Sequence, residues 1–259
     1  MGIKQRRAYW KGYLKLSYIS ILMRADRVSA LRVLRSRIGN NSVWHGLSVL
    51  FRLGFRPNGI LDIGAYHGEW ALTASQLFPE SRVLMVEAQP DLEPFLRAVA
   101  STNPARFDYR IALLGASTRK AVDFYQIGGD VSTGSSIFEE QTTARRTRLS
   151  LPMRRLGDLT TEIVPGKYQL LKLDVQGAEL QVLRGSGSLL DDIEVVVMES
   201  SLAEYNRGAP LFSEMLEAMS EFGFRIFDVF PLARRRGILL QVDAIFLREE
   251  SSLLPRPPF

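Results

Sequence analysis

Four acidic residues of this sequence each lie at the end of a short apolar run. Their residue types and their spacing indicate a ligand-binding site. They are Asp62 in "GILDIGA", Glu87 in "RVLMVEA", Asp174 in "YQLLKLD" and Glu199 in "IEVVVMES". Asp62 and Glu87 are 25 residues apart, as are Asp174 and Glu199, which is the length of one strand–helix unit. Parallel strands in register would bring these carboxylates together in the crevice where open α/β sheets bind ligands. Such a crevice suits a ligand that is cationic or rich in hydroxyl donors.

The loop "DIGAYHGEW" discriminates between two kinds of nucleotide-derived cofactor. A dinucleotide needs the spacing G-x-G-x-x-G, which lets backbone N–H groups approach its pyrophosphate. This loop has only Gly64 and Gly68, with Asp62 and His67 where that fingerprint needs glycine. S-adenosylmethionine has no phosphate, but it has an ammonium, a sulfonium and a ribose diol. Asp62 suits its amino-acid end and Glu87 suits its ribose, since hydrogen bonds to charged groups contribute about 1.5 to 3 kcal/mol each.

Four segments resemble the FkbM family of S-adenosylmethionine-dependent methyltransferases. They are "ILDIGAYHGEWAL", "VLMVEAQPDLEPFL", "STGSSIF" and, most specifically, "LLKLDVQGAELQVLRG". The resemblance extends from about Gly59 to Arg248. It implies a class I, Rossmann-like methyltransferase fold and O-methylation of a hydroxyl. The implied acceptors are sugars, polysaccharides and polyketide-type natural products.

By position, the resemblance also implies which residues contact the cofactor. These are Asp62, Gly64, Ala65, Tyr66 and Gly68 after the first strand, Glu87 and Ala88 after the second, and Ala112 after the third. The family signature matches Lys172, Asp174, Gly177 and Glu179. The family often has Asn after the Gly-Ala pair, whereas this sequence has Tyr66 and then His67, which leaves the contacts there open.

Methyl transfer to a hydroxyl needs a base, or a carboxylate that accepts the proton late in the transfer. Asp174, at the end of a central strand, is the first candidate. Lys172 precedes it by two residues and projects from the same face, where it could keep Asp174 ionised. Alternatively, Lys172 only neutralises acids such as Glu199. His67 is the second candidate base because histidine titrates near neutral pH, although its loop position favours a loop-shaping or cofactor-contacting role.

Acceptor contacts are predicted in the long connection between Ala112 and Asp174. The segments "KAVDFYQI" and "RTRLSLPM" are typical of extra strands, and they flank the loop "GGDVSTGSSIF". Long loops inside compact domains are usually functional, so Ser135 and Ser136 are expected to border the acceptor pocket together with Glu199. A plain surface loop is the alternative. For Glu179, a structural role is favoured over catalysis, because an acid in the first turn of a helix interacts favourably with the helix dipole.

A doubly wound parallel sheet is the scaffold that could position these residues. The apolar runs are continuous rather than alternating, which is typical of parallel strands covered on both faces. Helices are expected between them at Glu69–Leu77, Asp91–Ser101 and Ala178–Leu183. A hairpin over 224–248, with Arg234, Arg235 and Arg236 in its turn, would close the sheet. The expected fold is therefore α/β, with a seven-stranded, mostly parallel sheet and helices on both faces.

Charge divides the chain into unequal parts. Residues 1–56 contain twelve Lys or Arg and one acid, so they carry +11, whereas the whole chain carries +5. We expect a basic helical extension over 1–56, a methyltransferase domain over 57–250 and a flexible tail over 251–259. Residues 28–38 have the pattern of a basic amphipathic helix, which would attach to an anionic membrane, a nucleic acid or an acidic partner, or would pack on the domain. A second helix is expected between Ser42 and Gly54.

Composition excludes several classes of site. The chain has no cysteine, which excludes disulfides, thiolate metal sites and cysteine nucleophiles and favours a reducing cytoplasm. No metal is predicted. Its most apolar early segment, "YLKLSYISILM", is too short to span a membrane. Besides an O-methyltransferase, a nucleic-acid methyltransferase and a non-catalytic binding protein are the alternatives. The nucleic-acid methyltransferase is disfavoured because the basic extension has few aromatic residues for base stacking.

Overall fold

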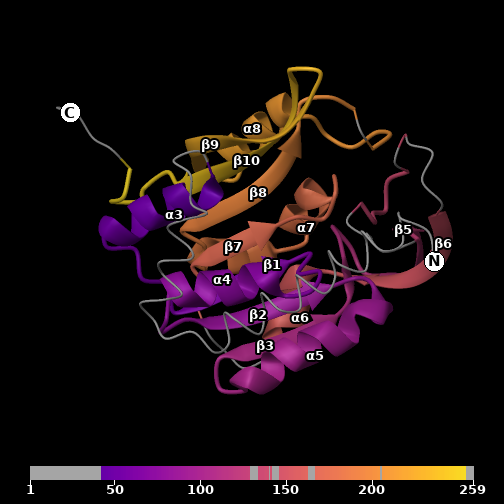
Figure 1. The fold of residues 1–259 in the computed structure, drawn as a ribbon, viewed down its shortest axis with the longest axis horizontal. Helices are drawn as coiled ribbons and strands as arrows, with labels where there is room; N and C mark the ends of the chain where they lie inside the picture. Colours follow the sequence, from indigo (N-terminus) through magenta and orange to yellow (C-terminus); the bar gives the residue numbers. More distant parts are fainter. Residues whose placement is uncertain are drawn as a thin grey trace, which may run out of the picture.

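A seven-stranded sheet forms the centre of the protein in a computed structural model, which describes residues 42–128, 134–139, 141, 146–162, 167–204 and 206–254. The strand order is β3-β2-β1-β7-β8-β10-β9 (Figure 1). The strands are β1 (Gly59–Ile63), β2 (Arg82–Glu87), β3 (Phe107–Ile111), β7 (Leu170–Leu173), β8 (Val195–Ser201), β9 (Phe224–Arg235) and β10 (Ile238–Arg248). Neighbouring strands are parallel except at β10, which is antiparallel to both β8 and β9. The sheet therefore has the topology of the class I, Rossmann-like methyltransferase fold.

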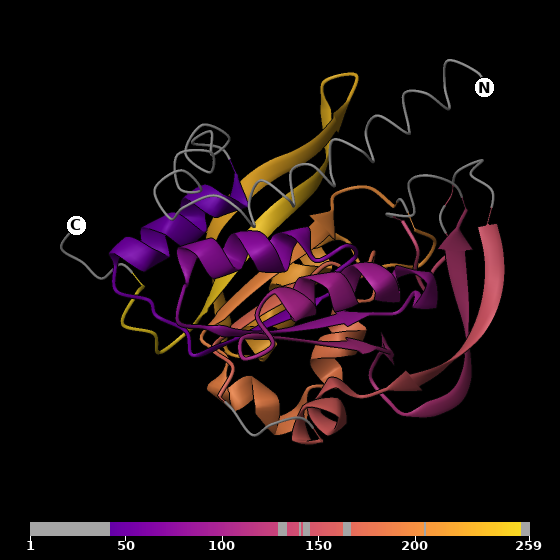
Figure 2. The same ribbon diagram turned by 60° about the horizontal axis from the view of Figure 1, so that its bottom comes forward.

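Helices cover both faces of this sheet, as expected. On one face, apolar residues of β1, β2 and β7 pack against α3 (Val43–Arg52), α4 (Glu69–Leu77) and α5 (Glu93–Thr102). On the other face they pack against α6 (Leu156–Thr161), α7 (Glu179–Arg184) and α8 (Phe212–Glu221). Figure 2 shows these two helical layers on either side of the strands. Because the central strands are buried on both faces, their continuous apolar runs follow directly from this layering.

A second sheet stands beside the first. Its strands are β4 (Leu113–Leu114), β5 (Arg119–Ile127) and β6 (Arg146–Arg154), in the order β4-β6-β5. The extra strands predicted from "KAVDFYQI" and "RTRLSLPM" are thus confirmed as the antiparallel pair β5 and β6. The loop between them returns to β5 at Ser136, whose backbone N and O both bond to Tyr125. Residues 129–133 and 142–145 of this connection lie outside the described residues.

The structure describes the two ends of the chain only in part. The helix predicted between Ser42 and Gly54 is confirmed as α3, whereas the amphipathic helix over 28–38 lies outside the described residues. Of the tail expected over 251–259, the structure describes residues 251–254, where Ser251 and Leu254 are buried and Ser251 Oγ donates to Glu194 Oε1 at 2.7 Å. No helix in the described part of the chain is long and apolar enough to cross a membrane.

Candidate cofactor and acceptor site

A cavity of about 460 Å³ lies outside the carboxyl ends of the parallel strands. Six of the predicted cofactor residues line it, namely Gly64, Ala65, Tyr66, Glu87, Ala88 and Ala112. All the predicted acceptor-side residues except His67 line it too, namely Lys172, Asp174, Glu199, Ser135 and Ser136. The sheet thus brings together most of the residues singled out by the sequence. Asp62, His67 and Gly68 are not among the residues that line the cavity.

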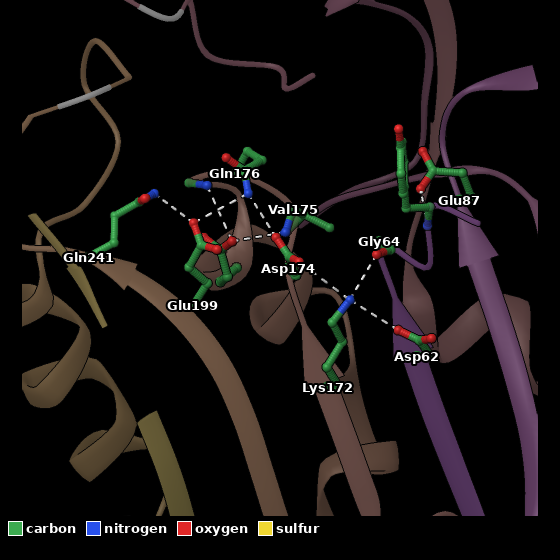
Figure 3. A network of polar contacts seen from close by, with 12 residues as sticks. Asp62, Gly64, Glu87, Lys172, Asp174, Val175, Gln176, Glu199 and Gln241 are labelled. Carbon is green, nitrogen blue, oxygen red and sulfur yellow. Dashed lines mark hydrogen bonds and ion pairs between the residues drawn. The ribbon is translucent and has the colours of Figure 1, made fainter. Parts of the chain in front are cut away.

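Lys172 lies within the sheet and contacts both the loop after β1 and Asp174 at the end of β7. Its Nζ donates to Gly64 O at 2.8 Å and lies 3.1 Å from Asp62 Oδ1 and 3.6 Å from Asp174 Oδ2 (Figure 3). The contact with Asp62 follows from strand register, because Asp62 of β1 pairs with Lys172 of β7. Burial alone would lower the pKa of Lys172, but the carboxylates of Asp62 and Asp174 raise it above its ordinary value. Lys172 therefore remains charged inside the strand.

Asp62 is fully buried on the α4 side of β1 and serves as the counter-ion of Lys172. Burial raises the pKa of Asp62, and the lysine opposes this shift. The sequence argument predicted that its carboxylate lies beside the cofactor; in the structure this carboxylate lies against the lysine within the sheet. Asp62 occupies a position of the first cofactor motif. In the structure its carboxylate holds Lys172, which in turn donates to the carbonyl of Gly64.

Gly64 lets the loop after β1 lie against the end of β7. Its φ is +74°, and a Cβ at this position would lie 1.9 Å from Asp174 O. No other residue could adopt this conformation and this approach without displacing the backbone. The close contact of the two loops places the cofactor side and the Asp174 side of the cavity next to each other.

Glu87, at the end of β2, is buried and already holds neighbouring backbone. Its Oε2 accepts from Tyr66 N at 2.9 Å, and its Oε1 accepts from Gln89 N at 3.0 Å and Gln89 Nε2 at 3.3 Å. Burial raises the pKa of Glu87, while these N–H donors lower it. A carboxylate offers about four acceptor sites, so these contacts leave room for a further donor from a ligand in the cavity.

Asp174 and Glu199 are joined by an amide that the sequence analysis did not single out. Gln176 Nε2 donates to Asp174 Oδ1 at 2.8 Å and to Glu199 Oε1 at 3.3 Å, and Gln241 Nε2 donates to Glu199 Oε1 at 2.7 Å (Figure 3). Burial, followed by the charges of Asp174, Glu179 and Asp243, raises the pKa of Glu199 to about 9. At neutral pH Glu199 is therefore protonated. Gln176 could have been found from its place within the "DVQGAE" segment, whereas nothing local in the sequence pointed to Gln241.

The backbone of Gln176 is held in an unusual conformation by two side chains from other loops. Its φ is +55°, in the left-handed region that costs energy for a residue with a Cβ. Ser136 Oγ donates to Gln176 O at 2.8 Å, and Asn206 Nδ2 donates to the same oxygen at 2.7 Å. Ser135 Oγ donates to Gln89 Oε1 at 3.0 Å. Both serines line the cavity, and both hydroxyls also hold the loops that surround it.

Glu179 and His67 support the loops of the site. Glu179 Oε1 accepts from Val175 N at 2.9 Å and from Gly177 N at 3.2 Å, and burial raises its pKa to about 7. This agrees with the structural role favoured for Glu179. The ring of His67 stacks on Tyr66, with centroids 3.8 Å apart, and lies 4.1 Å from the ring of Phe95. No group of three or more His, Asp or Glu in the described ranges is placed to hold a metal ion.

A sequence model of the methyltransferase FkbM domain matches residues 62–226. No curated protein matches the sequence. Among solved structures, cofactor-bound Rv0187 from MTB is 14% identical, with 86% of this chain and 89% of that chain covered and a TM-score of 0.48. Magnesium protoporphyrin IX methyltransferase from Synechocystis PCC 6803 is 10% identical, with coverages of 80% and 77% and a TM-score of 0.44. Precorrin-6y C5,15-methyltransferase from Geobacter metallireducens GS-15 is 12% identical, with coverages of 77% and 84% and a TM-score of 0.44.

Proposed function

This chain belongs to the FkbM family of methyltransferases, and we propose that it methylates a hydroxyl group of a sugar, polysaccharide or natural-product acceptor. The cofactor of this family is S-adenosylmethionine, which supplies the methyl group when it is bound. One observation supports the acceptor chemistry above all others: Asp174 lines the same cavity as the loops after β1 and β2. The proposed proton acceptor and the predicted cofactor loops thus border the same cavity.

The residues around the cavity fit S-adenosylmethionine. A volume of about 460 Å³ falls within the roughly 300 to 1,000 Å³ of ligand-binding cavities. Among the described residues that line it, Glu69, Glu87 and Asp174 are acidic, Glu199 is a fourth acid that is neutral at pH 7, and only Lys172 is basic. This excess of acids suits a ligand with an ammonium and a sulfonium. Glu87 would hold the ribose through its remaining acceptor site, and Gly64 leaves the adjacent space free of a side chain.

Asp174 is the residue proposed to take the proton of the acceptor hydroxyl. Lys172 lies 3.6 Å from its Oδ2, and Gln176 donates to its Oδ1, so both oxygens have a fixed environment. As the new C–O bond forms, the hydroxyl proton would pass to the Asp174 carboxylate. The neighbouring Glu199, protonated at neutral pH because of its raised pKa, could donate a hydrogen bond to a second oxygen of a polyol acceptor.

The cofactor assignment is tested by thermal unfolding in the presence of S-adenosylmethionine, S-adenosylhomocysteine or NAD. A ligand at a hundred times its dissociation constant adds about 2.7 kcal/mol to the free energy of unfolding. We expect both adenosyl ligands to raise Tm, NAD to have no effect, and Glu87→Ala to reduce the shift. Stabilisation by NAD, or no stabilisation by either adenosyl ligand, would contradict the assignment.

A further inference from the structure

The hairpin formed by β9 and β10 carries several exposed large hydrophobic side chains. Among the described residues, six large hydrophobic side chains are exposed. Four of these six lie on this hairpin: Ile226 (42%), Val229 (37%), Leu232 (47%) and Ile238 (66%). A fifth, Leu202, lies beside the hairpin, because its backbone N donates to Leu240 O at 2.8 Å. Leu232 and Ile238 lie near the turn of the hairpin, whereas Ile226 pairs with Phe246 near its other end. Exposed apolar side chains that lie together can mark an interaction surface, whereas single ones do not.

Arginines adjoin the apolar side chains at the end of this hairpin. Residues 232–240, here called the hairpin tip, include the exposed Arg234, Arg235 and Arg236, and no acid occurs between Asp228 and Asp243. Strand register places Ile238 opposite Arg235 and Leu239 opposite Arg234. Paired residues share a face of the hairpin, and successive pairs lie on opposite faces. Each face of the tip therefore has an aliphatic side chain opposite an arginine.

The hairpin tip extends from the cavity end of the sheet. The last pair between β10 and β8 joins Gln241 to Ser201, so residues 232–240 continue past the end of β8. Gln241 itself lines the cavity and donates to Glu199. Figure 2 shows the hairpin projecting beyond the other described helices and strands. A surface contacted by the tip would therefore lie on the same side of the protein as the cavity.

We propose that the hairpin tip docks the protein on an anionic membrane surface. Leu232 and Ile238 would enter the boundary between headgroups and acyl chains, and the three arginines would contact lipid phosphates. Apolar insertion combined with electrostatic attraction is the general basis of peripheral membrane binding. The exposed side chains of the tip are aliphatic rather than aromatic, which favours lipid over a nucleic acid, whose bases would stack on aromatic rings. The proposal does not depend on the identity of the acceptor.

A single fluorescent label provides a direct test, because the chain has no cysteine of its own. Ile238→Cys in the full-length protein is labelled with an environment-sensitive fluorophore and mixed with vesicles. The matched control is Ser101→Cys, an exposed position near the end of α5. We expect a blue shift at residue 238 with vesicles of phosphatidylcholine and phosphatidylglycerol, no shift with phosphatidylcholine alone, and no shift at residue 101 with either.

Charge reversal separates the tip from the basic residues at the start of the chain. Each basic residue near an anionic membrane surface adds a similar favourable free energy of binding. The triple variant Arg234→Glu/Arg235→Glu/Arg236→Glu should therefore bind these vesicles about a hundredfold more weakly. The control reverses Arg27, Arg32 and Arg35 instead and should retain the blue shift at residue 238. Unchanged binding of the tip variant would overturn the proposal. A shift at residue 238 with single-stranded RNA but not with anionic vesicles would also overturn it and would make the tip a nucleic-acid surface. The adenosyl-ligand shift in Tm is measured separately and reports on the cofactor site alone.

Discussion

Lys172 is the residue on which the geometry of the site depends most. It is buried, and its ammonium contacts Asp62, Asp174 and the carbonyl of Gly64. One cation thus holds a counter-ion inside the sheet, the proposed base and the loop after β1. The sequence predicted that Lys172 and Asp174 project from the same face. It did not predict that Asp62 faces Lys172, because that contact depends on which strand pairs with β1.

Removing the charge of Lys172 should destabilise the protein strongly. Lys172→Met leaves Asp62 buried without its cation, and breaking a buried ion pair costs about 3 to 5 kcal/mol. Chemical denaturation would measure this loss. The double variant Asp62→Asn/Lys172→Met removes both charges and should recover part of the stability. If the double variant is as unstable as the single one, the ion pair is not the cause.

Asp174→Asn should abolish turnover while S-adenosylmethionine still raises Tm. Loss of a general base lowers the rate by about a hundred- to ten-thousandfold, and the amide keeps the shape of the side chain. Single-turnover kinetics would measure the chemical step. His67→Gln is the matched comparison, and it should keep most of the activity because its ring packs on Tyr66 and Phe95 rather than lining the cavity. The opposite result would transfer the role of base to His67.

Glu199 should make the stability of the protein fall as pH rises. Its pKa is raised to about 9 in the folded state from an ordinary value of 4.5, so between these values the folded protein binds more protons than the unfolded chain. Stability is then fully present below the ordinary pKa and is lost as pH rises through the folded one, at up to about 1.4 kcal/mol per pH unit for one proton. Denaturation across this range should show a flatter profile for Glu199→Gln than for the wild type. An exposed acid, Glu221→Gln, is the control and should leave the profile unchanged.

At the scale of elements, the loop 175–177 after β7 links the site to two distant segments. Gln176 O accepts from Ser136 and Asn206, while Glu179 holds the N–H groups of Val175 and Gly177. The expected outcome is that Gln176→Ala and Gln176→Gly both lower kcat, since both lose the amide that contacts Asp174 and Glu199. Glycine adopts φ of +55° freely, so an active Gln176→Gly variant would show instead that only the backbone conformation matters.

The elements that hold the cofactor side could be predicted well from the sequence. The helix expected at Glu69–Leu77 is α4, and the apolar runs ending at Asp62 and Glu87 are β1 and β2. The helix expected at Asp91–Ser101 instead begins at Glu93, because Pro90–Leu92 forms a separate 3₁₀ turn. Helices α6 and α8 were not predicted. Helix α6 has only six residues, too few for a clear helical period, and α8 follows a long loop with no strand signal to mark its start.

At the scale of the whole molecule, the contacts that complete the site join segments far apart in the chain. Gln241 reaches Glu199 because β10 inserts antiparallel between β8 and β9. Ser136 reaches Gln176 because the second sheet bends the connection after β3 over the cavity. Neither contact has a local sequence signal. The predicted attachment through residues 28–38 lies outside the described residues, whereas the hairpin tip provides a second basic and apolar surface on the cavity side.

The central claim is methyl transfer to a hydroxyl, and product analysis tests it most directly. The protein would be incubated with S-adenosylmethionine carrying a deuterated methyl group and a panel of sugars and polyols, and the products analysed by mass spectrometry and NMR. Our account predicts a deuterated methyl ether in at least one acceptor with the wild type, formed at least about a hundredfold more slowly with Asp174→Asn. A deuterated methyl group on nitrogen, or on RNA or DNA added in parallel, would contradict the account, as would transfer to oxygen at the wild-type rate in the Asp174→Asn variant.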